Sequence, residues 1–245
     1  MNHYNEYQYR DLLIREQDPY AEKKYRLIAD CLKDKRSLHI LNAGCGSGEL
    51  SFLLSDKGHR VFGIDPAEEY IGLARTAAER KGLKDCVFEV SSIENFTDKD
   101  QYDCVIATDV LEHIEADYSA LAKLSRLVKP GGMLIVTVPA LEFLFGYHDR
   151  ELGHFRRYSK LTLRRLINSQ SLLEIRILRY FGFTLIPICL LFSRILKRSY
   201  PIGPRTKGFG SAMKKYVLNF LLFLDSCIPM PFGTSLLCVA RKKQD

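Results

Sequence analysis

Short apolar runs alternate with longer amphipathic stretches between residues 37 and 139. The runs have the length of buried strands, and the stretches repeat their apolar positions with the period of a helix. The predicted strands cover 37–42, 60–64, 86–90, 102–107 and 133–138, and the predicted helices between them cover 49–57, 67–81 and 116–128. Strands that alternate with helices pair in parallel through right-handed crossovers. The pattern therefore predicts an α/β fold with a doubly wound, mostly parallel sheet.

The pattern loosens on both sides of this region. The further predicted elements are a helical segment over 4–36, a loop over 141–158, a helix over 161–169 and strands over 172–180 and 235–241. Two apolar blocks, 181–191 and 216–224, lie between the last two strands. Each block is too short or too interrupted for a membrane-spanning helix, which needs about 20 apolar residues. We expect an N-terminal helical segment (1–36), a core (37–180), a helical insertion (181–232) and a last strand with a tail (233–245).

Charge is concentrated in the insertion. The 245 residues carry a net charge of +7, yet residues 175–224 hold nine Lys or Arg and no Asp or Glu, and the rest of the chain has 27 basic against 29 acidic residues. The basic residues stand among Leu, Ile and Phe, a pattern typical of a helix that lies on an anionic membrane surface. The alternatives are a cap over the site or a dimer contact, and the oligomeric state stays open. Nucleic acid is not expected as a partner, because no stacking aromatics accompany the charges on an exposed groove.

Seven cysteines are scattered along the chain without a C-x-x-C pair. This spacing does not suggest a zinc ribbon or a disulfide framework, and it favours reduced thiols in the cytoplasm. The N-terminal residues carry no apolar stretch of the secretory kind. We therefore expect a cytoplasmic protein, peripheral at the inner face of the membrane.

A glycine-rich loop, NAGCGSG over 42–48, follows the first predicted strand and begins a helix. Glycines allow a tight turn and a close approach of the backbone to a ligand. Asp65 ends the second strand, 17 residues after Gly48, where a carboxylate accepts hydrogen bonds from a ribose diol. The G-x-G-x-G spacing is one residue shorter than the G-x-G-x-x-G that seats the pyrophosphate of a dinucleotide. The combination indicates an adenosine-containing ligand other than a dinucleotide.

Four motifs stand in order along the chain: LNAGCGSGEL (41–50), VFGIDP (61–66), YDCVIATDVLEHI (102–114) and LVKPGGMLIVTVP (127–139). They closely resemble those of class I S-adenosylmethionine-dependent methyltransferases. The resemblance covers residues 38 to about 180 and the last strand. It implies a Rossmann-like sheet of seven strands with an antiparallel last strand, S-adenosyl-L-methionine as the cofactor, and methyl transfer as the reaction.

The resemblance also assigns cofactor-binding residues. The glycine loop would hold the methionine part of the cofactor, Asp65 would bind the ribose, Pro66 would border the adenine, and Thr108 would face the methyl sulfonium. The full expected set is Asn42, Gly44, Cys45, Gly46, Gly48, Asp65, Pro66, Ser92, Ile93 and Thr108. Two positions depart from the family pattern, since Asn42 and Ser92 stand where an acid is usual, and we expect weaker cofactor affinity as a result.

Asp109, Glu112 and His113 are spaced i, i+3, i+4 and so share one helical face. Three interpretations stay open. His113 is a general base, or the three side chains hold a divalent cation with His148 or His154, as in some quinone and RNA methyltransferases that the segment resembles, or Asp109 caps a helix and His113 packs structurally. We take Asp109, His113 and His154 as the candidate catalytic residues and expect no metal.

Residues 147–158, YHDRELGHFRRY, resemble an H-[FY]-R-R-Y segment of a bacterial subgroup of these enzymes. Arginine pairs bind carboxylates and phosphates bidentately, and His154 is placed to deprotonate a hydroxyl. The candidate substrate-binding residues are His148, Arg156, Arg157 and Tyr158. The alternative is a loop held by salt bridges to Asp149 and Glu151.

The sequence therefore predicts a methyltransferase that acts on a small or lipid-linked amphipathic acceptor, by O-methylation. A methyltransferase of a sugar or secondary metabolite, with the insertion as a substrate cap, is the alternative. The intact glycine loop with Asp65 disfavours a third hypothesis, a cofactor-binding protein without activity.

Overall fold

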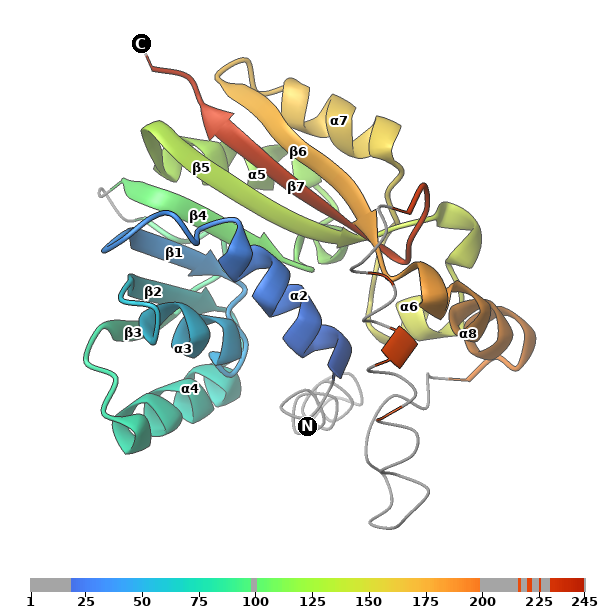
Figure 1. Ribbon diagram of the computed structural model, residues 1–245, viewed down its shortest axis with the longest axis horizontal. Helices are drawn as coiled ribbons and strands as arrows, with labels where there is room; N and C mark the ends of the chain where they lie inside the picture. Colours follow the sequence, from blue (N-terminus) through green and yellow to red (C-terminus); the bar gives the residue numbers. More distant parts are fainter. Residues whose placement is uncertain are drawn as a thin grey trace.

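The structure is a computed structural model that describes residues 19–97, 101–198, 216, 220, 221, 225 and 230–244. A seven-stranded sheet in the order β3-β2-β1-β4-β5-β7-β6 forms its centre (Figure 1). The strands are β1 His39–Ala43, β2 Arg60–Asp65, β3 Cys86–Val90, β4 Tyr102–Thr108, β5 Val128–Pro139, β6 Leu173–Phe181 and β7 Ser235–Lys242. Strands β1 to β5 pair in parallel, and β7 runs antiparallel between β5 and β6. The fold class and the antiparallel last strand predicted from the sequence are confirmed.

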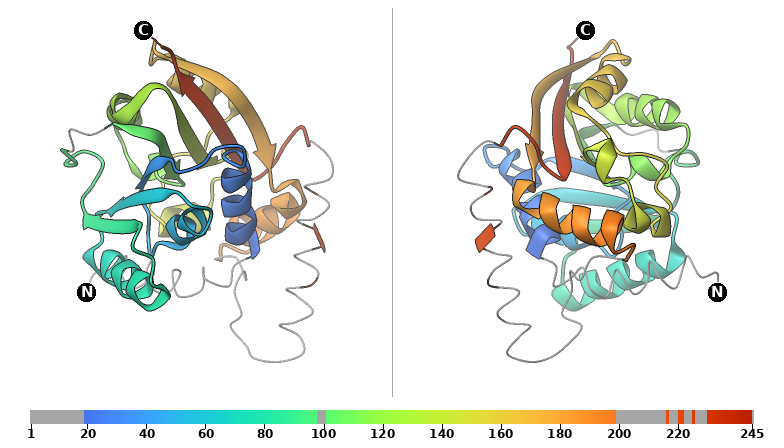
Figure 2. Two further views of the ribbon diagram at one scale, coloured as in Figure 1. Left: turned by 60° about the vertical axis from the view of Figure 1, so that its left-hand side comes forward. Right: turned by 90° about the vertical axis from the view of Figure 1, so that its right-hand side faces the viewer.

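Helices cover both faces of the sheet (Figures 1 and 2). The helices are α2 Pro19–Asp30, α3 Glu49–Ser55, α4 Glu68–Lys81, α5 Asp117–Leu127, α6 Tyr147–Glu151, α7 Lys160–Asn168 and α8 Ile186–Cys189. Successive residues of a strand point to opposite faces. In β5, Leu134 and Val136 therefore belong to the apolar cluster that includes residues of α5 and α7, while Ile135 belongs to the cluster that includes residues of α2, α3 and α4. Each face has its own apolar core, and the central strands are buried on both sides.

Several predicted boundaries agree with the structure. Ser159 caps α7 through a hydrogen bond from the amide of Thr162, and Gly82 ends α4 with φ 67°. The first predicted helix is observed only as α2, because residues 1–18 lie outside the described part of the chain. Most of the second apolar block, 216–224, also lies outside it.

The structure corrects two predicted elements and gives the helices of a third, the expected helical insertion. Strand β5 begins at Val128 instead of residue 133. Residues 129–132, predicted as a turn, lie within β5 and cause a register shift in the pairing of β5 with β4. The predicted loop over 141–158 contains the 3-10 helix η2 Glu142–Leu144 and the helix α6. The first apolar block forms the 3-10 helix η3 Phe183–Leu185, α8 and the π-helix η4 Leu190–Ile195.

The helical part of the insertion projects beside the carboxyl ends of β5 and β6, next to α6 (Figures 1 and 2). Among the described residues, no helix combines the length and the apolar character needed to cross a membrane.

Candidate active site

The glycine loop follows β1 and begins α3, at the carboxyl edge of the sheet (Figure 1). Gly44, Gly46 and Gly48 have φ values of 73°, 55° and 94°, which residues with a side chain adopt only with strain. The amide of Gly44 donates a hydrogen bond to the carbonyl of Ile64 at 2.8 Å, so the loop is tied to the end of β2. A Cβ atom on Gly44 would lie 2.3 Å from Cγ2 of Val110, just after β4. Glycine is therefore required where the loop passes the end of β4.

Asp65 ends β2 with its carboxylate against the glycine loop. Its Oδ2 accepts a hydrogen bond from the amide of Gly46, and its Oδ1 accepts one from the amide of Ala67, both at 3.0 Å. Asp65 therefore fixes the shape of the loop, a role that the sequence analysis did not include. An ionised carboxylate has about four acceptor positions, so these two bonds are compatible with the expected contact to a ribose. The ribose contact itself stays a prediction.

Two buried polar atoms lie near the ends of β1 and β4 without a hydrogen-bond partner among the described residues. They are Oδ1 of Asn42 and Oγ1 of Thr108. The amide nitrogen of Asn42 is satisfied, because it donates to Oγ of Ser51 at 3.0 Å. Buried polar atoms nearly always have partners, so these two positions are ones that a ligand or an ordered water can satisfy. These residues fit a polar cofactor beside the glycine loop.

The other expected cofactor residues border the same region. The amide of Ser91 donates to the carbonyl of Asp65 at 3.0 Å, which places the following Ser92 and Ile93 beside the end of β2. Ile93 is buried, and Pro66 is exposed. Cys45 is buried too, and its burial raises the pKa of its thiol well above the usual value, so the thiol stays neutral. The roles assigned to these residues stay predictions.

Asp109 follows β4 with a positive φ of 52°. Its Oδ1 accepts a hydrogen bond from Oγ1 of Thr137 at 3.0 Å, and its Oδ2 forms an ion pair with Nζ of Lys24 on α2. The Lys24 side chain is 10% exposed and that of Asp109 25%, so the pair is largely withdrawn from water. The charge of Asp109, a candidate catalytic residue, is thus balanced by a lysine of the N-terminal helix.

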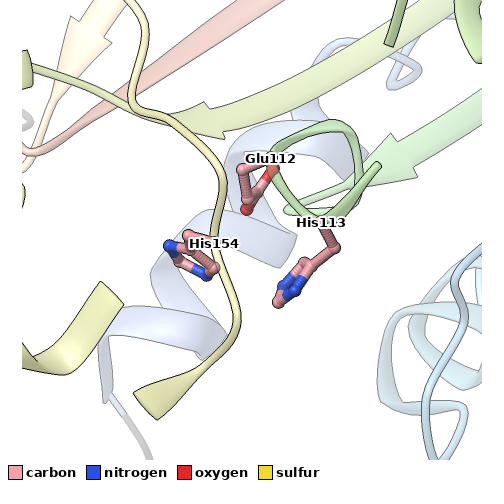
Figure 3. Close-up of side chains that lie close together, drawn as sticks. All are labelled: Glu112, His113 and His154. Carbon is pink, nitrogen blue, oxygen red and sulfur yellow. The ribbon is translucent and has the colours of Figure 1, made fainter. Parts of the chain in front are cut away.

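Glu112, His113 and His154 converge just beyond Asp109 (Figure 3). Glu112 and His113 belong to the 3-10 helix η1 Leu111–His113, and His154 comes from the segment after α6. One nitrogen or oxygen atom of each side chain lies within 4.8 Å of the others, a grouping that could hold a metal ion. The two imidazole rings meet edge to face with centroids 4.6 Å apart. The structure thus brings together two of the three candidate catalytic residues and places Asp109 two residues before η1.

The Glu112 carboxyl group is fully buried, and neither of its oxygens has a hydrogen-bond partner among the described residues. Burial, assisted by the nearby charge of Asp109, raises the pKa of Glu112 well above its usual range. A buried carboxyl group without partners is costly to ionise. Glu112 is therefore protonated over a wider pH range than an exposed glutamate.

Asp149 organises the segment that carries His154. Its buried carboxylate accepts hydrogen bonds from the amide of Gly146 at 2.9 Å and from Nε of Arg157 at 2.7 Å, and lies 3.1 Å from Nδ1 of His154. Burial alone would raise the pKa of Asp149, but the hydrogen bond with His154, the charge and hydrogen bond of Arg157 and the Gly146 amide lower it to about 2. Arg157 is buried and also donates to the carbonyl of Ala140 at 3.1 Å.

The candidate substrate-binding residues do not form one cluster. Arg157 is engaged by Asp149, whereas Arg156 lies 2.8 Å from Asp117 in an ion pair. Tyr158 donates its hydroxyl to the same Asp117 at 2.8 Å. The pair of Arg157 with Asp149 agrees with the alternative of a salt-bridged loop, whereas Arg156 pairs with Asp117 instead of the expected Glu151. The substrate-binding roles of these residues and of half-buried His148 stay predictions.

A comparison with protein families matches residues 34–167 to a family described as a methyltransferase domain. The matched segment covers more than half of the chain and contains the glycine loop, Asp65 and the cluster of Figure 3. The chain belongs to this methyltransferase domain family. The family resemblance inferred from the four sequence motifs is therefore confirmed.

Two curated relatives support the family assignment, and a solved structure shares the fold. The chain is 31% identical over 117 residues to a ubiquinone biosynthesis O-methyltransferase of Bradyrhizobium sp. (strain ORS 278), and the match covers 48% of this chain and 46% of the relative. A protein of the same name from Coxiella burnetii (strain RSA 331 / Henzerling II) is 30% identical over 160 residues, 58% of this chain and 67% of the relative. The chain spans about half the length of the first of these relatives. The crystal structure of the N-methyltransferase NodS from Bradyrhizobium japonicum WM9 with S-adenosyl-l-homocysteine shares the fold, with a TM-score of 0.60 at 14% identity over 92% of this chain and 88% of that one.

Reasoning from the sequence missed Lys24 and gave Asp149 only a salt-bridging role. A signal for Lys24 was present, because it shares the apolar face of α2 with Ala21 and Ile28 at i, i+3 and i+7. A buried lysine on such a face requires an anionic partner. Nothing in the sequence identified that partner as Asp109, 85 residues away.

Proposed function

We propose that the protein methylates a hydroxyl oxygen of an amphipathic, lipid-linked small molecule at an anionic membrane surface. One observation carries the proposal: the exposed apolar and basic helix of the insertion packs directly on the segment that leads to His148 and His154. The amide of His148 donates to Oγ of Ser193 in η4 at 3.2 Å. Arg194 of the same helix donates to the carbonyl of Phe145 at 3.1 Å. A surface that contacts lipid would thus adjoin the acceptor side of the site.

The cofactor side follows from the geometry of the loop. The glycine loop and Asp65 would hold the cofactor, with Asn42 and Thr108 satisfying its polar groups. S-adenosylmethionine supplies an electrophilic methyl group on a sulfonium when bound. The task left to the protein is to align the acceptor and to remove its proton.

His113 and His154 would remove that proton. His113 belongs to η1 just after β4, and the ring of His154 lies against its ring, with centroids 4.6 Å apart. Val110, which immediately precedes η1, lies close to Gly44 of the glycine loop. A neutral imidazole accepts a proton near neutral pH, so a hydroxyl group that reaches this pair can be deprotonated as it attacks. Asp109 would keep the carboxyl end of β4 in place through Thr137 and Lys24. The names of the O-methyltransferase relatives support oxygen as the methylated atom.

The membrane-facing part of the proposal depends on the surface of η4 and the residues that follow it. Leu191 and Ile195 are 44% and 65% exposed, and Leu196 is 47% exposed. The exposed side chains of Arg194 and Lys197 lie in the same segment. Apolar burial and about 1 kcal/mol per basic residue at an anionic surface would together hold the protein on the membrane.

Sedimentation with lipid vesicles tests the location. We expect the wild type to sediment with vesicles of phosphatidylglycerol and phosphatidylethanolamine, with high salt weakening the binding only in part, since salt screens the charges and leaves the apolar contacts. Arg194→Gln, Lys197→Gln and Arg198→Gln together should reduce sedimentation without changing affinity for S-adenosylhomocysteine. The matched control replaces the exposed Lys33, Lys35 and Arg36, which precede β1 at the opposite edge of the sheet.

Transfer of a labelled methyl group tests the reaction. We expect label from S-adenosylmethionine to enter the organic phase of a membrane lipid extract in a base-stable, ether-like product. A wild type that stays in the supernatant of the vesicle experiment contradicts the membrane surface. Label that appears only in water-soluble products contradicts the lipid-linked acceptor.

The alternative function, methylation of a sugar or secondary metabolite under a substrate cap, rests on another contact. Leu144, beside α6, packs with Leu185 and Cys189 of the insertion in a small apolar cluster of its own. That packing suits a cap as well as a surface element. Water-soluble labelled products, together with a wild-type protein that does not sediment with vesicles, would favour this alternative.

A further inference from the structure

The buried carboxylate of Asp149 belongs to neither the cofactor loop nor the ring pair of Figure 3, yet it contacts His154. Its side chain is 0% exposed, and its three polar neighbours are the Gly146 amide and Nε of Arg157, which donate to it, and Nδ1 of His154. Arg157 is itself anchored to the carbonyl of Ala140. The carboxylate is therefore fixed from two sides before it meets the imidazole.

This arrangement determines which nitrogen of His154 carries the proton. An ionised carboxylate can only accept hydrogen bonds. With Gly146 and Arg157 already donating to it, Asp149 is stable as the anion. The Nδ1 of His154, 3.1 Å from Oδ1 of Asp149, must then be the protonated nitrogen. The neutral ring is left with its lone pair on Nε2.

The backbone places the other edge of the ring at the candidate site. The amide of Phe155 donates to the carbonyl of Glu112 at 2.8 Å, which fixes the chain beside η1 immediately after His154. The His154 ring then stands edge to face with that of His113 (Figure 3). With Nδ1 turned to Asp149, the ring turns its other nitrogen toward the Glu112 and His113 side.

We propose that Asp149 is a positioning residue that fixes His154 as the Nδ1–H tautomer, so that Nε2 is the atom that takes the acceptor's proton. This inference rests on the proposed function, in which His154 serves as a base. In the transfer step, the acceptor oxygen forms a bond to the methyl carbon as its O–H proton passes to Nε2. The bond from the methyl carbon to sulfur breaks with its electron pair left on sulfur. The imidazolium that results is stabilised by the adjacent carboxylate.

A purely structural Asp149 would hold α6 and Arg157 but leave the tautomer of His154 undetermined. Long-range ¹H–¹⁵N NMR spectra distinguish a structural role from a positioning role, because protonated and unprotonated ring nitrogens have well-separated ¹⁵N shifts. The His154 signals are assigned by their loss in His154→Gln. We expect a protonated Nδ1 in the wild type and a shift of population to Nε2–H in Asp149→Asn, whose amide can donate to Nδ1. A wild-type ring with its proton on Nε2 overturns the proposal without any variant.

The matched control is Asp103→Asn. Asp103 also accepts a backbone hydrogen bond, from His39 at 2.8 Å, and pairs with a cation, Lys129 at 2.7 Å, but it lies near the start of β4. This variant should leave both the tautomer of His154 and methyl transfer unchanged. If it moves the His154 signals, the response to Asp149→Asn is not specific to the contact.

Kinetics separate the positioning role from the base itself. We expect Asp149→Asn to lower kcat for labelled-methyl transfer into the lipid extract by at least roughly 100-fold with KM for S-adenosylmethionine unchanged, in line with the usual contribution of a general base. In a His154→Ala background, Asp149→Asn should not lower kcat any further. Full activity of His154→Ala contradicts the proposed base. Loss of activity in His154→Ala with normal activity in Asp149→Asn contradicts the positioning role alone.

Discussion

Lys24 on α2 reaches Asp109 after β4, so the N-terminal helix contributes a buried positive charge to the carboxyl edge of the sheet. The pair joins residues 85 positions apart. A second contact fixes the start of the same helix, since the hydroxyl of Tyr20 donates to Oγ of Ser235 at 2.7 Å at the start of β7. Helix α2 is thus part of the site's framework rather than a separate N-terminal element.

Removing Lys24 should therefore destabilise the fold. Lys24→Met keeps the apolar stem but leaves the carboxylate of Asp109 largely buried and without its cation. We expect a loss of about 1–3 kcal/mol in the free energy of unfolding, measured in urea. Adding Asp109→Asn should restore part of the loss, because the uncompensated charge is gone. Lys33→Met, at an exposed position beyond the end of α2, is the control and should change stability little. Equal effects of the two lysine variants would refute the buried pair.

One substitution of Asp65 tests both its contacts to the glycine loop and its expected contact to the ribose. Asp65→Ala removes the acceptor for the amides of Gly46 and Ala67 as well as the expected contact to the ribose. Affinity for S-adenosylhomocysteine should fall by about 1–3 kcal/mol in calorimetry. Asp56→Ala, an exposed aspartate at the end of α3, is the matched control. Unchanged affinity in Asp65→Ala would place the cofactor elsewhere.

The sequence was sufficient for the sheet and the cofactor loop because both depend on local signals. Glycines indicate the turns with positive φ, and Ser159 indicates the start of α7. Short apolar runs indicate the buried strands. It was insufficient where contacts between distant residues decide the structure. Helix α6 has five residues, too few to show a helical period, and Asp149 stabilises it through a partner eight positions away.

The start of β5 was missed for a similar reason. Pro130 and the two following glycines are typical of a turn, and in the structure they are accommodated as an irregularity inside a paired strand. Gly132 is required there, because a Cβ atom at this position would lie 2.9 Å from the carbonyl of Asp103 on β4. Only the neighbouring strand makes that requirement visible.

The cluster of Figure 3 allows a direct test of metal dependence. We expect EDTA to leave methyl transfer unchanged, because Lys24 already supplies the positive charge that Asp109 needs, and because burial favours the protonated form of Glu112. The measurement is turnover with EDTA, followed by addition of Mg²⁺, Mn²⁺ or Zn²⁺. Affinity for S-adenosylhomocysteine with and without EDTA controls for damage to the fold. A loss of turnover that one of these ions restores would show that Glu112, His113 and His154 hold a metal.

Glu112 should make stability depend on pH with a definite sign. In the unfolded chain it ionises near its ordinary pKa of about 4.3, whereas burial, with the charge of Asp109, raises its pKa well above that in the fold. As pH rises past about 4, the unfolded chain releases a proton that the folded protein keeps, so Glu112 increasingly lowers stability. Glu112→Gln removes this cost while keeping the shape of the side chain. The melting temperature of the variant should exceed that of the wild type at pH 8, and the difference should vanish toward pH 4. Glu115→Gln, an exposed neighbour, should show no such trend, and a constant difference across pH would mean that Glu112 ionises normally in the fold.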